Sequence, residues 1–568
     1  MSATTSETKT QAKERCGRIE KVLLENWIGP HRAHICSINE FRHWQVGEVE
    51  ALFQLLPPLK DRKLSPHGPE FRNPPHGKQR WKELAMKSAM IGAVDVLAVA
   101  ASPLAVFSKT VRNEALPQLV KFNYEAIGSS FFVKCPLDLL RQAVDVGMAV
   151  CVNRWGQFSI RGGGYAAISH VWVETMGFEF NDEKLEQDER GINYAHFGRI
   201  ISTAVKSSGY EWFWLDLLAV PQIGGDEKEA SMLRDLKTNV INSLIHVYRN
   251  ADAVIILDSL TLQLPSVDAC VVAALLSCGR WLTRMWTYQE VKLARKAHVV
   301  TKTGTIDFRA MVEALESREK QSDVAHRYWH EIHLKFARLL PSDPRGVSLA
   351  DVAFCCSDRN TENDIDYARS VFALLDLQWV PGWDYEDAIL HIIKSRPQGA
   401  ARIANLQGRR GLPPPYSWAP RYLARLTGVI MDDYTATEDG LRGWWTTFAV
   451  RRIIRHGPNT KETKLIFHME LLNRRGEPFE MWSELPYYWS DQLDEWLEKA
   501  VPSGTARLLC ARVPENLLLD HPPVVMLMVV GGEAEPFGAH VGTVVGTTEM
   551  NDPDVTELDG ERWEWLLA

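Results

Sequence analysis

Apolar and polar positions follow two alternating patterns in the middle of the chain. Residues 165–169, 211–216 and 253–257 are short, largely apolar runs. Between the second and third runs, residues 233–247 place an apolar side chain every three or four positions, as on one face of a helix. Apolar strands alternating with helices are typical of a parallel α/β sheet. We therefore expect one parallel sheet with flanking helices over about residues 165–301.

Polar residues stand where each predicted strand ends. Parallel sheets bind ligands beyond the carboxyl ends of their strands, so these positions are candidates for a site. They are Ser169, His170 and Trp172 after the first strand, Asp216 and Gln222 after the second, and Asp258 after the third.

The run 281–290 follows the third predicted strand and carries the main candidate. If it is helical, Trp286 and Glu290 lie one turn apart on the same face, with Arg284 close by. A carboxylate against an indole fits a small-molecule site. It also fits a helix surface that only covers its own tryptophan. Because the polar residues at the strand ends are expected to lie near this run, the small-molecule site is the favoured interpretation.

The sequence outside the α/β domain predicts three further regions. We expect a mainly helical N-terminal region over 1–160, the α/β domain over 161–305, a helical region over 306–420 and a β-rich region over 421–568. In the last region, the strand at 524–530 should pair with one near 541–545, because Gly531 and Gly532 indicate a turn.

Composition narrows the class of protein. A chain of 568 residues is too long to fold around a single hydrophobic core, so about three or four domains are expected. The net charge of -8 and the lack of basic stripes argue against nucleic acid as the main ligand. Nine scattered cysteines without a C-x-x-C pair or zinc-ligand spacing indicate reduced thiols in a cytoplasmic protein. Residues 88–107 are long enough to span a membrane, but Asp95 and Pro103 favour a buried helix pair.

Four blocks in fixed order resemble a known family. The blocks 165–172, 213–222, 247–258 and 284–290 closely resemble the fungal heterokaryon-incompatibility (HET) domain, over about residues 165–301. Residues 359–420 resemble the region that usually accompanies this domain, and 524–546 its β-rich C-terminal part. Two positions depart from the family pattern: Ala219 replaces a frequent cysteine, and Val173 replaces a glycine.

The resemblance implies a fold, a role and a site. HET domains are regarded as relatives of Toll/interleukin-1 receptor (TIR) domains, which have a flavodoxin-like fold and in several cases cleave the nicotinamide–ribose bond of NAD. Trp286 and Glu290 have the spacing of the TIR tryptophan and catalytic glutamate. The resemblance therefore implies Glu290 as the catalytic carboxylate, with Ser169, His170, Trp172, Asp216, Arg284 and Trp286 as ligand-binding residues.

Three functional readings stay open at this point. The first is an NAD glycohydrolase of non-self recognition and programmed cell death, activated by self-association or by a partner protein. The second is a non-catalytic signalling or scaffold module that associates through the HET domain. The third is a diverged relative with neither activity. The first reading needs no cofactor, because NAD is the substrate, and none of the three involves a metal.

Overall fold

A computed structural model of the protein describes most residues from 132 onwards. The described residues are 14, 17–18, 132–171, 191–221, 223, 227–258, 260–264, 268–321, 326–340, 347–356, 359, 361, 363–406, 408, 410–423, 426, 430, 434–456, 464–473, 475–486, 496–510, 524–531, 537–547 and 561–568. Most of the expected N-terminal helical region, Trp172 and Gln222 lie outside them. The chain divides into two compact units, Met1–Pro341 and Ser342–Ala568.

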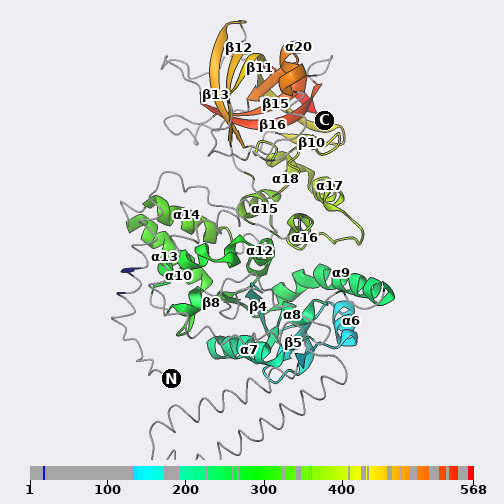
Figure 1. Ribbon diagram of the computed structural model, residues 1–568, viewed down its shortest axis with the longest axis vertical. Coiled ribbons are helices and arrows are strands. Elements are labelled where there is room, and N and C mark those ends of the chain that lie inside the picture. Colours follow the sequence, from blue (N-terminus) through cyan, green and yellow to red (C-terminus); the bar gives the residue numbers. More distant parts are fainter. Residues whose placement is uncertain are drawn as a thin grey trace, which may run out of the picture. The chain divides into compact units, whose positions relative to one another are not determined.

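The first unit is a mixed α/β structure built on a seven-stranded sheet with the order β3-β2-β6-β4-β7-β8-β9. Figure 1 labels β4 and β8 of this sheet. The strands are β2 (Ala149–Asn153), β3 (Phe158–Arg161), β4 (Ala166–His170), β6 (Trp212–Trp214), β7 (Ala253–Leu257), β8 (Ala297–Val300) and β9 (Thr305–Asp307). The strands β6, β4, β7 and β8 run parallel. The three predicted strands are therefore neighbours, which confirms that part of the prediction.

The sheet is not purely parallel, and this corrects the sequence-based expectation. β2 pairs antiparallel with both β3 and β6, and β9 pairs antiparallel with β8. β2 and most of β3 also lie before residue 161, in a stretch expected to be mainly helical. All five residues of β2 are buried. A short apolar run of this kind cannot be distinguished from a buried helix by periodicity alone.

Helix α7 (Tyr194–Ser208) packs on one face of the sheet. Its residues Phe197, Ile200 and Ala204 share a hydrophobic core with Ile168 of β4. Successive side chains of a strand point to opposite faces, so Ser169 points away from α7. A short ladder of β1 (Phe132–Val133) and β5 (Ile192–Asn193) precedes α7.

Helix α9 (Glu227–Asn250) packs on the face towards which Ser169 points. Tyr165 lies four positions before Ser169, so its side chain points to the same face of the sheet. Its hydroxyl donates to the Val247 carbonyl of α9 at 2.6 Å. The rings of Trp214 and Tyr248 meet edge to face with centroids 5.3 Å apart. The apolar positions that predicted this helix are its buried face: Leu233, Leu236, Val240, Leu244 and Val247.

The run 281–290 forms two short helices rather than one. They are α11 (Arg280–Thr283) and α12 (Met285–Lys292), and the backbone is extended between them at Arg284, with φ -87° and ψ 138°. The Thr287 side chain contacts the carbonyls of Trp281 and Arg284 at 2.6 and 3.0 Å, and so ties the two helices together. Trp286 and Glu290 both lie on α12, as the spacing predicted.

Among the described residues of the first unit, six further helices flank this core. They are α6 (Leu137–Asp145), α8 (Asp216–Ala219), η4 (Thr261–Gln263), α10 (Ala269–Cys278), α13 (Phe308–Gln321) and α14 (His326–Ala337).

The second unit consists of helices followed by a largely antiparallel sheet. The helices are α15 (Leu349–Cys356), α16 (Asp366–Phe372), α17 (Tyr385–Ser395) and α18 (Pro397–Arg402), with η5 (Trp496–Ala500) and α20 (Val501–Ser503) inserted between strands. The strands are β10 (Thr435–Thr437), β11 (Gly440–His456), β12 (Lys464–Leu472), β13 (Pro478–Pro486), β14 (Ala506–Cys510), β15 (Val524–Gly531), β16 (Phe537–Thr547) and β17 (Glu561–Leu567). β15 pairs antiparallel with β16, and Val525 lies opposite Val545, which confirms the predicted pairing.

Candidate functional site

The candidate residues gather where the order of the parallel strands reverses. From β4 the chain continues to β6 on one side of it and then to β7 on the other. Ligands of open α/β sheets bind beyond the carboxyl ends of the strands at such a reversal. Ser169 and His170 are the last two residues of β4, and Asp258 directly follows β7.

A directed chain of hydrogen bonds links three buried side chains. The indole Nε1 of Trp281 donates to Ser169 Oγ at 2.7 Å. Because an indole nitrogen can only donate, the serine oxygen accepts this bond, and its own proton points to Glu290 Oε2. Ser169 and Glu290 are 121 residues apart in sequence, and the fold brings them into direct contact.

A second hydroxyl, that of Tyr248 on α9, also bonds the Glu290 carboxyl. Burial raises the pKa of Glu290 from 4.5 to about 7, because the charged form loses its water. The bond from Ser169 opposes this rise, the nearby charge of Asp216 adds to it, and Arg284 and Tyr248 lower it. A carboxyl that changes its charge near neutral pH is suited to acid–base or electrostatic chemistry.

His170 pairs with Asp216 at the same end of the sheet. Its Nε2 lies 2.9 Å from Asp216 Oδ1. The imidazole is fully buried, whereas the Asp216 side chain is 21% exposed. The same carboxylate oxygen accepts the Leu217 amide at 2.7 Å, where α8 begins. Asp216 therefore holds the histidine in place and anchors the segment that follows β6.

Arg284 directly precedes α12, and Trp286 lies on this helix. Both side chains are half-buried. Arg284 acts on Glu290 through its charge, which lowers the pKa of the carboxyl. The structure thus gathers Ser169, His170, Asp216, Arg284 and Glu290, while Trp172 lies outside the described residues.

Asp258 shapes the backbone beside the site. Its Oδ1 accepts the amides of Leu260 and Thr261 at 3.0 and 3.1 Å, so it holds the turn that leads into η4. Burial raises the pKa of Asp258 to about 6. A Cβ at Gly279 would lie 2.5 Å from Asp258 Oδ2, so any other residue at the entry to α11 would force the Asp258 side chain to shift.

Sequence reasoning did not identify two residues that contact this group, Trp281 and Tyr248. Trp281 lies in the run 281–290 and Tyr248 in one of the four family-like blocks, but the sequence assigned neither residue a role. The hydrogen bond of Trp281 joins residues that are 112 positions apart in sequence. The contact of Tyr248 depends on the direction in which a face of α9 points. The residue spacing along the chain carries no signal of such contacts.

Comparisons with protein-family models, curated proteins and solved structures found no match to this chain. Within the described residues, no helix is long and apolar enough to cross a membrane. In that same part of the chain, no group of three or more His, Cys, Asp or Glu side chains is arranged to hold a metal ion.

Proposed function

We propose that the Met1–Pro341 unit contains a HET-like, TIR-related domain that hydrolyses NAD at its nicotinamide–ribose bond, in a protein of non-self recognition or programmed cell death. The observation that carries the proposal is the buried carboxyl of Glu290, with a pKa near neutrality, bonded by Ser169 at the strand-order reversal. The resemblance of the four sequence blocks supplies the reaction class. The order of the parallel strands, β6-β4-β7-β8, is the one that a flavodoxin-like sheet would have.

The chemistry assigns a role to each group. The bond between the ribose C1′ and the nicotinamide nitrogen breaks, nicotinamide leaves with the bonding electrons, and water adds to the ribose to give ADP-ribose and a proton. The ribose carries positive charge as the bond breaks, and ionised Glu290 stabilises that charge. Ser169 holds one carboxylate oxygen, while Arg284 favours the ionised form of Glu290.

Burial of the site suggests how activity is controlled. Glu290 is only 7% exposed, and its carboxyl is bonded by two protein hydroxyls. Substrate must therefore reach a carboxyl that protein groups enclose. This accords with an activity released by self-association or by a partner.

The test is NAD consumption by concentrated purified protein. Glu290→Gln preserves size and removes charge, so the rate should fall on the order of 10²- to 10³-fold while the fold is retained. Glu313→Gln, an exposed carboxylate change on α13, is the matched control and should leave the rate unchanged. Equal NAD loss in the parent and in Glu290→Gln would reject the catalytic role.

A second candidate function is a non-catalytic scaffold. The observation that favours it is the same enclosure of Glu290, which also suits a purely structural carboxyl. If the concentrated parent protein consumes no NAD but self-associates, and Glu290→Gln associates equally well, this candidate replaces the enzyme.

A further inference from the structure

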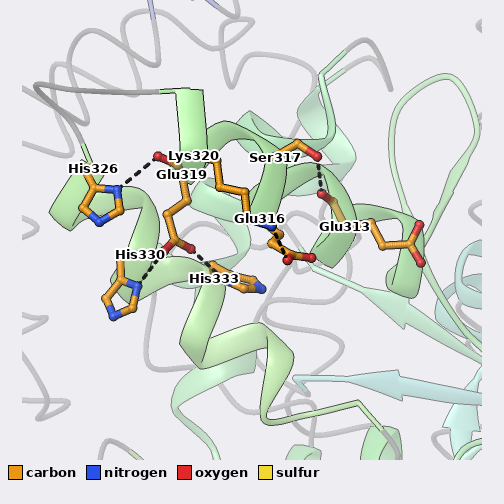
Figure 2. Close-up of polar contacts among 8 residues, drawn as sticks. All are labelled: Glu313, Glu316, Ser317, Glu319, Lys320, His326, His330 and His333. Carbon is orange, nitrogen blue, oxygen red and sulfur yellow. Dashed lines mark hydrogen bonds and ion pairs between the residues drawn. The ribbon is translucent and has the colours of Figure 1, made fainter. Parts of the chain in front are cut away.

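A second cluster of titratable side chains joins α13 and α14. It shares no residue with the proposed NAD site. Figure 2 shows three histidines of α14 arranged around one glutamate of α13. The histidines occur at intervals of four and three residues, so they share one face of α14. They are His326, His330 and His333, and the glutamate is Glu319.

Every one of these imidazoles uses its Nδ1 to contact Glu319. His330 and His333 approach the two carboxylate oxygens at 2.8 Å each. His326 approaches the backbone carbonyl of the same residue at 3.1 Å. Lys320 pairs with Glu316 at 2.7 Å, so its ammonium does not occupy the carboxylate of Glu319.

These acceptors fix the tautomer of the rings. A carbonyl oxygen and an ionised carboxylate can only accept hydrogen bonds. Nδ1 must therefore carry the proton, and Nε2 of each neutral ring carries a lone pair. Within the described part of the chain, no hydrogen-bond partner lies on Nε2 of His326 or His330.

We propose that His326 and His330 form a surface site for a divalent transition-metal ion such as Zn²⁺ or Cu²⁺, with Glu319 orienting both rings. A histidine that donates its Nδ1 proton to a carboxylate or carbonyl while offering Nε2 is the usual metal-ligand arrangement. Two histidines at i and i+4 of a helix are a common pair of zinc ligands. Imidazole nitrogen also suits copper and nickel.

The geometry selects this pair among the three histidines. The rings of His326 and His330 are stacked, 5.9 Å apart at an interplanar angle of 22°. Figure 2 shows the ring of His333 directed away from the other two. His326 is exposed, and the His330 side chain is 45% exposed, so both can tilt towards one ion. Water would complete the coordination, in keeping with the lack of a third described ligand.

The experiment is calorimetric titration of the full chain with Zn²⁺, and separately with Cu²⁺, at pH 7.5 in buffer without chelating components. His326→Ala and His330→Ala should each remove one binding event or weaken it at least about 10-fold, since one ligand is lost. Glu319→Gln should weaken it by about 10- to 100-fold, the usual effect of losing the group that orients a ligand.

His333→Ala is the matched control, because it loses a bond to the same carboxylate but not a proposed ligand. It should bind the ion like the parent. His326→Ala is the variant least prone to misfold, since the side chain is exposed. The proposal is overturned if the parent binds neither ion, or if His326→Ala and the parent give identical stoichiometry and affinity. An equal loss in His333→Ala would show that the cluster only clamps the two helices.

Discussion

The Glu290 carboxyl illustrates how opposing effects set the charge of one buried residue. Desolvation favours the neutral acid, whereas donors such as Ser169 and Tyr248 favour the carboxylate. The Ser169 hydroxyl accepts the indole N–H of Trp281 and donates its own proton to Glu290. Glu290, which the sequence identified by its spacing from Trp286, thus lies in an environment that Trp281 and Tyr248 help to form.

This balance predicts a pH dependence of folding stability. The pKa of Glu290 is about 7 in the folded protein and 4.5 when exposed, so the folded state binds more protons between these values. Stability should therefore fall as pH rises from about 4.5 to 7 and then level off, by on the order of 3 kcal/mol from this group. Glu290→Gln mimics the neutral acid and should remove that part of the slope.

The measurement is chemical denaturation of both proteins at several pH values. The difference between them isolates Glu290, because the raised pKa of Asp258 acts equally in each. Parallel curves for the two proteins would contradict the raised pKa.

At the scale of elements, the sequence predicted those strands and helices whose apolar residues follow a regular local pattern. β4, β6 and β7 were found because buried parallel strands are continuously apolar, and α9 because its apolar residues recur every three to four positions. The hairpin of β2 and β3 was missed, because its role as an antiparallel extension depends on pairing with β6. The break at Arg284 was missed for a similar reason: side-chain contacts made by Thr287 hold it.

Thr287 gives the prediction at this scale. Thr287→Val keeps the shape but leaves the carbonyls of Trp281 and Arg284 without their side-chain donor. We expect a loss of about 1–3 kcal/mol in the free energy of unfolding, measured by denaturant titration. The residue is only 1% exposed, so water cannot readily replace the hydroxyl.

Thr287→Ser is the matched control for this change. It retains the donor and should recover much of the loss. If valine and serine variants are equally stable, packing of the methyl group rather than the hydrogen bond joins α11 to α12.

At the scale of the whole molecule, the proposed chemistry is confined to one unit. Every residue assigned to the NAD site, and both proposed metal ligands, belongs to Met1–Pro341. The Ser342–Ala568 unit has a core of its own, in which β11, β12 and β14 contribute buried residues such as Phe448, Phe467 and Leu508. Its sheet therefore does not require residues of the first unit to bury its apolar face.

This division predicts that a chain ending at Pro341 keeps the chemistry of the site. It should fold, show the same difference in pH-dependent stability between parent and Glu290→Gln, and consume NAD at a rate comparable to that of the full chain. Circular dichroism and denaturation establish folding and the Glu290 effect independently of activity. A folded fragment that keeps the pH effect but loses NAD cleavage would assign the second unit a part in catalysis or in its control. A fragment that loses both would mean that the Glu290 environment itself needs residues beyond Pro341, contrary to the contacts of Ser169, Trp281 and Tyr248 described above.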